Sequence, residues 1–274
     1  MITVSDGPAT ASSRWRDFCH ELNRWGAEGR IATLWWRDDD AVTPCRQLDE
    51  LFRVADGIPV ALAVIPAFTG SALAGWLEQC APSSARVLQH GWRHLDHGGS
   101  GKKSEFPSSR RQDRAVADLR KGHERVVGLF GSRALEVLAP PWNRFEEAFL
   151  PILIEAGIAS ISTIKPRSTA YPLAGLYASN VHVDLIAWRG ERGFIGAAAA
   201  LDGLTAHLRD RRCGSADTDE PTGILTHHLV QDSAAKAFLG ELIGLTRRHP
   251  AVHWLDAGEV FLPAGAAVAN WSRA

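Results

Sequence analysis

Three consecutive carboxylates, Asp38, Asp39 and Asp40, follow an apolar run that has the composition of a buried strand. Adjacent carboxylates repel one another unless a proton or a cation lies close by, and both conditions are typical of chemical sites. The alternative interpretation is an acidic turn at the start of a helix, because aspartate is favoured at helix amino termini. The rest of the chain must therefore decide between a site and a helix cap.

Two histidines four residues apart, His90 and His94, come at the end of another strand-like run. This spacing places both imidazoles on one side of a turn or helix start, as it does in zinc-binding helices. Two imidazoles and one carboxylate, with positions left open for water, make a hydrolytic metal site. The chain has 11 histidines, so such a pair also arises by chance, and it indicates a metal only in combination with the carboxylates.

Other polar or rigid residues also follow strand-like runs, and they include Pro141, Trp142, Asp184, His227 and His228. Taken singly, each has a structural interpretation, as a rigid turn or as a core side chain at a strand end. Of the two adjacent histidines, strand alternation favours His227 as the one that faces a site.

Strand-like apolar runs alternate with segments of helical periodicity along most of the chain. The predicted strands span residues 31–36, 59–65, 85–89, 134–139, 158–163, 181–185, 223–226 and 252–255. This alternation predicts an α/β fold, a single-domain distorted (β/α) barrel with seven or eight parallel strands, with an open doubly wound sheet as the alternative. In such a barrel the carboxyl ends of the strands hold the site, where the polar residues above converge.

One domain is expected at residues 31–274, preceded by an N-terminal helical extension at residues 1–30, because no stretch has the length and composition of a linker. The extension has large apolar residues at helical spacing: Trp15, Phe18, Leu22 and Trp25.

Charge and hydropathy exclude several classes of partner. The 30 basic and 31 acidic side chains give a net charge of -1 without a basic block, so no nucleic acid is expected to bind. No apolar run reaches the length of a membrane span, and the amino terminus lacks a secretory pattern, so a cytoplasmic location is expected. Small-molecule or glycan substrates fit this composition better.

Taken in order, these motifs resemble the NodB-type polysaccharide deacetylase family. The matching segments are residues 37–40, 90–94, 139–142, 184–188 and 225–227. The resemblance covers most of the chain and implies a distorted (β/α) barrel and a metal-dependent hydrolase that removes acetyl groups from N-acetylated sugars.

Carried over to this chain, the resemblance implies that Asp38 is the general base and that Asp39, His90 and His94 bind a divalent metal. His227 is then the general acid that protonates the departing amine. The two-histidine, one-carboxylate set suits zinc first, and also cobalt, nickel, manganese or iron.

The sequence departs from the family pattern at two positions. Ala139 stands where the family has an arginine that contacts the base, and Arg37 and Arg144 are the two candidates to replace it. Asp40 replaces the glycine that follows the aspartate pair. It is a further ligand, a hydrogen-bond partner for substrate, or the cap of the next helix.

Aromatic faces stack on the apolar faces of sugar rings, although the same side chains also form packed walls around metals. The predicted substrate-binding residues are Asp40, Trp92, His97, Pro141, Trp142 and Asp184. Two rival functions stay open. One is a metal-dependent hydrolase of another C–N or ester bond, and the other is an inactive carbohydrate-binding relative.

Overall fold

The computed structural model describes residues 8–99, 101–190 and 192–261. Its centre is β1 (Ala32–Ala41), which lies in a curled sheet whose neighbouring strands all run parallel in the order β6-β5-β4-β3-β2-β1-β10-β7. The other strands of the sheet are β2 (Val60–Val64), β3 (Ala85–Gln89), β4 (Ala134–Leu138), β5 (Ser160–Ile161), β6 (Tyr177–Ala178), β7 (Val183–Asp184), β10 (Thr222–Thr226) and β11 (Val252–Trp254), which pairs with the start of β1.

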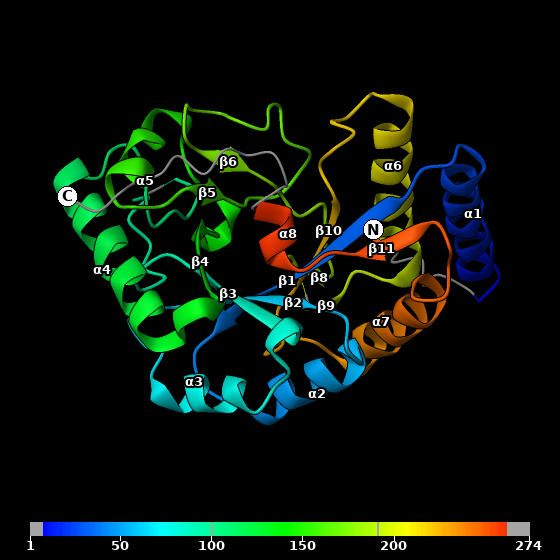
Figure 1. Cartoon of the computed structure of the whole chain (residues 1–274), viewed down its shortest axis with the longest axis horizontal. Coiled ribbons are helices and arrows are strands. Elements are labelled where there is room, and N and C mark those ends of the chain that lie inside the picture. The colour runs from blue at the N-terminus through cyan, green and yellow to red at the C-terminus, as the bar shows by residue number, and fades with distance from the viewer. Residues whose placement is uncertain (1–7, 100, 191, 262–274) are drawn as a thin grey trace.

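The helices surround the curled strands, as Figure 1 shows. They are α1 (Pro8–Ala27), α2 (Arg46–Ala55), α3 (Ser71–Glu78), α4 (Gln112–Phe130), α5 (Pro151–Glu155), α6 (Ala197–Cys213), α7 (Ser233–Thr246) and α8 (Ala257–Phe261). Four 3-10 turns, η1 (Pro82–Ser84), η2 (Gly131–Arg133), η3 (Pro141–Asn143) and η4 (Glu147–Phe149), and an antiparallel pair, β8 (Ile186–Ala187) with β9 (Gly193–Phe194), complete the fold. The predicted α/β barrel is confirmed. It is distorted, because in the described residues its end strands β6 and β7 do not pair with each other.

α1 packs along α6, and its buried residues Phe18, Leu22 and Trp25 belong to the main apolar core. Residues 1–7 of the expected extension and residues 262–274 of the expected domain lie outside the described residues. No helix in the described part of the chain is both long and apolar enough to span a membrane.

Residues of β1 alternate between two apolar clusters. Leu34 and Trp36 lie in the layer between the sheet and the helices, whereas Trp35 lies in the smaller cluster that fills the inside of the barrel. By the same alternation Arg37 faces the interior, and Asp38 faces the helical layer.

β1 is longer than the sequence predicts. The predicted strand ended at Trp36, whereas β1 continues through all three aspartates to Ala41. Its register with β2 shifts between Asp38 and Ala41, and Asp40 has a φ of 71°, a left-handed conformation that aspartate tolerates better than most residues. This bulge takes Asp40 out of strict alternation. The predicted role of Asp40 as a helix cap is wrong, because the residue at the N-cap position of α2 is Cys45.

The close packing of β10 on β1 depends on Gly223. A Cβ at this position would lie 2.4 Å from Trp35 Nε1, 2.7 Å from Val181 Cα and 2.8 Å from the Asn180 carbonyl oxygen. Two of these are backbone atoms that cannot rotate away. Only glycine therefore allows the Trp35 indole to donate its hydrogen bond to the Asn180 carbonyl at 3.1 Å.

We expect Gly223→Ala to lower the free energy of unfolding by about 2 kcal/mol or more, the cost of overpacking a rigid core. The matched control is Gly240→Ala in α7, where the added Cβ meets nothing within 4 Å and alanine improves helix propensity by up to about 1 kcal/mol. Urea denaturation of both variants measures whether the free energy of unfolding falls in Gly223→Ala and rises in Gly240→Ala. Equal stability of Gly223→Ala and the parent would show that β10 can shift.

Candidate functional site

Polar side chains from four strands meet at the carboxyl edge of the barrel, as the strand-end rule predicts. Asp39 and Asp40 come from the end of β1, His90 follows β3, Asp184 ends β7, and His227 follows β10. The bulge in β1 and the turn after β3 decide which of these groups touch.

Asp40, His90 and His94 present three ligand atoms that lie within 4.8 Å of one another. Asp40 Oδ1 is 3.3 Å from His90 Nε2 and 3.5 Å from His94 Nε2, and this oxygen is buried without a hydrogen bond. Two ligands at 2.1 Å from a tetrahedral ion are about 3.4 Å apart. The spacing and the unpartnered oxygen therefore fit a divalent metal.

The surroundings of His90 favour the same interpretation. His90 Nδ1 lies 2.8 Å from the Ala139 carbonyl oxygen, which can only accept, so the ring hydrogen is on Nδ1 and Nε2 keeps its lone pair for the cluster. Without a metal, Nε2 can instead be protonated and donate to Asp40; burial alone would raise the pKa of the Asp40 carboxyl, but the protonated His90 outweighs burial and holds this pKa well below its usual range. Asp40 is therefore a carboxylate and not an acid.

Asp39, which the sequence predicted as the metal ligand, is held elsewhere. Arg37 Nε and Nη2 donate to its two oxygens at 2.8 and 3.0 Å, and both side chains are almost fully buried. Arg37 Nη1 also donates to the Ser162 carbonyl and hydroxyl, and its Nη2 donates to Asn143 Oδ1. Among the ligand clusters of the described residues, Asp40 takes the place predicted for Asp39.

The two arginines that were candidates to replace the one absent at Ala139 lie in different places. Arg37 contacts the carboxylate next to the cluster, whereas Arg144 is exposed and donates to the Lys103 carbonyl. Of the two candidates, Arg37 is therefore the one that lies beside a site carboxylate.

Asp38, predicted as the general base, lies on the opposite face of β1. Its carboxylate is fully buried and accepts hydrogen bonds from Thr226 Oγ1 at 2.6 Å and His228 Nδ1 at 2.5 Å. Trp36 Nε1 donates to the same threonine. This network joins the ends of β1 and β10 beneath the helices, so Asp38 is not positioned to meet a substrate, and His228 faces away from the interior as predicted.

His227 lies between two carboxylates inside the barrel. Its Nε2 is 4.0 Å from Asp39 Oδ2, and its buried Nδ1 is 3.8 Å from Asp184 Oδ1. Asp184 accepts hydrogen bonds from Trp188 Nε1 at 2.6 Å and from the Ile186 amide at 3.0 Å, and burial raises the pKa of its carboxyl. The arrangement gives the imidazole one carboxylate on each nitrogen.

Two tryptophans flank these histidines. The Trp142 ring lies 4.3 Å from the His94 ring, and the Trp188 ring meets the His227 ring edge-on at 4.7 Å. Trp142 has a φ of 58°, a left-handed conformation that a bulky side chain adopts only when its surroundings fix it. Trp188 is 44% exposed, so its ring is open to a ligand.

The other predicted substrate-binding residues lie farther from the cluster. Pro141 is buried behind Gly91, and the Trp92 ring packs against Lys121 of α4. His97 is on an exposed loop, where its amide donates to the Ser104 carbonyl. Among the described residues, neither Trp92 nor His97 makes a side-chain hydrogen bond or ring contact with the cluster.

Glu105 is a site residue whose role the sequence did not reveal. It is 1% exposed, and its carboxylate accepts the backbone amides of Trp92, Arg93 and His94 at 3.1, 2.8 and 3.2 Å. A Cβ on Gly91 would lie 1.9 Å from Glu105 Oε2, so that glycine makes room for the carboxylate. Glu105 thus fixes the turn that carries His94.

A second cluster, formed by His182, His207 and Glu220, also has ligand spacing. The Gly223 amide donates to His182 Nδ1 at 2.9 Å, so the neutral ring carries its hydrogen on Nε2 and has no lone pair left for a metal. The two imidazoles stack with their centroids 3.3 Å apart. Burial lowers the pKa of both histidines, that of His207 to about 2, so the pair is neutral packing between α6 and β10.

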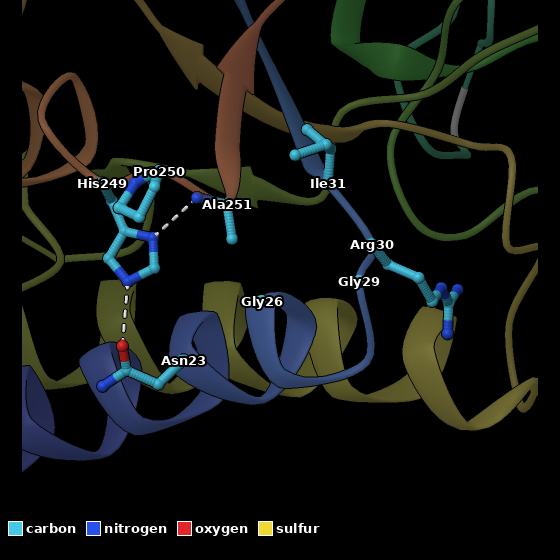
Figure 2. A pocket seen from close by; sticks show the side chains of 8 residues that line it. All are labelled: Asn23, Gly26, Gly29, Arg30, Ile31, His249, Pro250 and Ala251. Carbon is cyan, nitrogen blue, oxygen red and sulfur yellow. Dashed lines mark hydrogen bonds between the residues drawn. The ribbon is translucent and has the colours of Figure 1, made fainter.

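A shallow pocket lies at the other end of the barrel, between the end of α1 and the turn before β11 (Figure 2). Figure 2 shows His249 between Asn23 and the Ala251 amide, with which it makes hydrogen bonds of 3.2 Å each. No carboxylate lines this pocket. Neither of the clusters with ligand spacing in the described residues lies in this pocket.

No protein-family model and no curated protein matches the sequence. Solved structures do match it. A Mycobacterium smegmatis protein described as a polysaccharide deacetylase is 14% identical, with a TM-score of 0.58 over 85% of this chain and 90% of that one. The Bc1960 peptidoglycan N-acetylglucosamine deacetylase is 12% identical, with a TM-score of 0.51 over 87% of this chain and 95% of that one. The chitin deacetylase of the fungus Colletotrichum lindemuthianum is also 12% identical, with a TM-score of 0.50 over 88% of this chain and 91% of that one. The fold is therefore that of the family the motifs resemble.

We expect Glu105→Ala to lower the free energy of unfolding by at least about 2 kcal/mol, because three backbone donors lose a charged acceptor. Glu241→Ala, at an exposed position of α7, is the matched control and should change stability by less than about 0.5 kcal/mol. Guanidinium denaturation measures both. Similar small values for the two variants would mean that water replaces the Glu105 carboxylate without cost.

The stacked histidines predict a loss of stability in acid. The folded protein keeps His207 neutral, whereas the unfolded chain protonates it below its ordinary pKa of 6.5, so stability falls as the pH drops from 6.5 toward the folded value of about 2. This residue contributes a slope of up to about 1.4 kcal/mol per pH unit. His207→Gln should make the slope shallower between pH 6.5 and 5, and exposed His253→Gln should leave it unchanged. An unaltered slope in His207→Gln would contradict the neutral stack.

Proposed function

We propose that this protein is a metal-dependent hydrolase that removes an acetyl or other acyl group from an N-acetylated sugar or sugar-containing intermediate. The observation that carries this proposal is the presence of three groups of side chains at one edge of the barrel. They are the possible metal ligands Asp40, His90 and His94, the ion pair of Asp39 with Arg37, and His227 beside Asp184.

Asp40, His90 and His94 would hold the divalent metal, with zinc first and cobalt, nickel, manganese or iron as alternatives. When bound, such a metal polarises an acyl carbonyl and lowers the pKa of a water molecule. Glu105 contributes by holding the turn on which His94 lies.

Asp39 is the proposed general base. Its two hydrogen bonds from Arg37 orient the carboxylate toward the interior and pair it with a positive charge. In this position it takes a proton from the attacking water. The roles are thus shifted by one residue from those that the sequence suggested, with Asp39 in place of Asp38 and Asp40 in place of Asp39.

His227 is the proposed general acid. Asp184 Oδ1 lies 3.8 Å from Nδ1, and Nε2 faces Asp39, beside which a departing amine would lie. His227 gives its proton to the departing amine while Asp39 takes one from the attacking water, so the net charge of these two side chains does not change.

The aromatic pair Trp142 and Trp188 supports a carbohydrate substrate, because each ring borders a proposed functional histidine and can stack on a sugar face. The solved structures of the same fold add support, since two are named as deacetylases of peptidoglycan N-acetylglucosamine and of chitin.

We expect opposite effects from the two adjacent aspartates. Asp39→Asn should keep a stoichiometric metal while turnover falls by about 10²–10⁴, the range for loss of a positioned base. Asp40→Asn should lose the metal. Elemental analysis of protein purified without chelator, together with an acetate-release assay on N-acetylated oligosaccharides, tests both. If Asp39→Asn loses the metal and Asp40→Asn retains it, the ligand is Asp39 after all.

The same assay separates the proposal from its rivals. Faster release from simple esters or acylamines than from N-acetylated sugars would favour a different hydrolase. A metal-free protein that binds sugars without releasing acetate would favour an inactive carbohydrate-binding relative.

A further inference from the structure

Each of the two tryptophans beside the proposed site has a cation over its ring. Lys103 Nζ lies 5.9 Å from the centre of the Trp142 ring, and the Arg192 guanidinium carbon lies 5.8 Å from that of Trp188. Cation–π attraction holds such groups over an aromatic face without consuming their charge. The two cations therefore lie near the rings that contact His94 and His227.

Basic side chains near this edge make no ion pair with a carboxylate of the described residues. Three further exposed residues lie on the same loops, and none of the five forms such an ion pair: Arg93, Lys102, Lys103, Arg189 and Arg192. The carboxylate of Asp96, on the loop of Lys103, accepts the amides of Gly98 and Ser104, which lower its pKa with a smaller contribution from the charge of Lys103.

Elsewhere on the surface, arginines are commonly paired. Examples are Arg14 with Asp202, Arg46 with Glu50, Arg111 with Asp113, Arg212 with Glu21 and Arg247 with Asp56. In the described part of the chain, other exposed cations, among them Arg16, Arg53 and Arg248, are also without an ion pair. What distinguishes Lys103 and Arg192 is their place over the two tryptophan rings that contact His94 and His227.

We propose that the substrate carries oxyanion groups, phosphate or carboxylate, on sugar positions that flank the acylated unit, and that Lys103 and Arg192 bind them. This inference rests on the proposed function for the position of the acyl group. Of the site carboxylates, Asp39 is paired with Arg37, and a divalent metal held by Asp40, His90 and His94 would offset the charge of Asp40. Lys103 and Arg192 then raise the local concentration of anions beside the two tryptophans.

The test compares three N-acetylated probes on the metal-loaded protein: neutral N,N′-diacetylchitobiose, N-acetylglucosamine 1-phosphate and N-acetylmuramic acid. We expect kcat/KM for acetate release from at least one anionic probe to exceed that of the neutral probe by about tenfold at low salt. Lys103→Ala or Arg192→Ala should each reduce the preferred anion's kcat/KM by about fivefold, the upper range for a surface ion pair, and leave the neutral probe unchanged. The ratio of kcat/KM for the preferred anionic probe to kcat/KM for the neutral probe should fall as the salt concentration rises.

Arg248→Ala is the matched control, since Arg248 is exposed beyond α7 at the opposite end of the strands. It should change none of the ratios. Lys103→Arg should keep the preference. The two anionic probes distinguish a phosphate from a carboxylate source.

Binding measured by calorimetry on the Asp39→Asn variant separates the two proposals. If no probe releases acetate but an anionic probe binds more tightly than the neutral one, and Lys103→Ala removes the difference, the proposed reaction is wrong and the anion site stands. Equal binding of neutral and anionic probes, or a preference that survives loss of both cations, overturns the anion site whatever the activity.

Discussion

Three adjacent carboxylates lie on one strand, and the architecture depends on giving each a different environment. Asp38 accepts hydrogen bonds from Thr226 and His228, and Asp39 is paired with Arg37, whereas Asp40 is 30% exposed and lies 3.3 and 3.5 Å from the two histidines of the turn after β3. A buried carboxylate without a partner would cost several kcal/mol, so Asp38 and Asp39 cannot be left alone. β1 therefore carries side chains that contact residues of β10, of the turn after β3 and of the barrel interior.

A bulge makes this division possible. Strict alternation would place Asp38 and Asp40 on one face and Asp39 on the other. The positive φ of Asp40 and the shifted register with β2 turn Asp40 toward the histidines, so that Asp39 and Asp40 both serve the interior while Asp38 stays under the helices. The strain is confined to a residue type that tolerates it.

The arginine pair of Asp39 is formed within one strand. The family resemblance implied an arginine at position 139, and here the alanine at that position instead offers its carbonyl to His90. Arg37, two residues before Asp39 on the same strand, supplies a positive charge beside the carboxylate. The fold is shared with solved structures at identities of only 12–14%.

Periodicity and the polar residues that follow apolar runs were sufficient to predict the alternation of strands and helices, the barrel, and the edge at which the aspartates lie near His90, His94 and His227, because these features are set locally along the chain. They could not predict which aspartate contacts which partner, since a one-residue bulge has no periodic signature. Glu105 and Arg37 were also decided by tertiary structure. Their roles come from three backbone amides and one carboxylate that only the folded chain brings within hydrogen-bond distance.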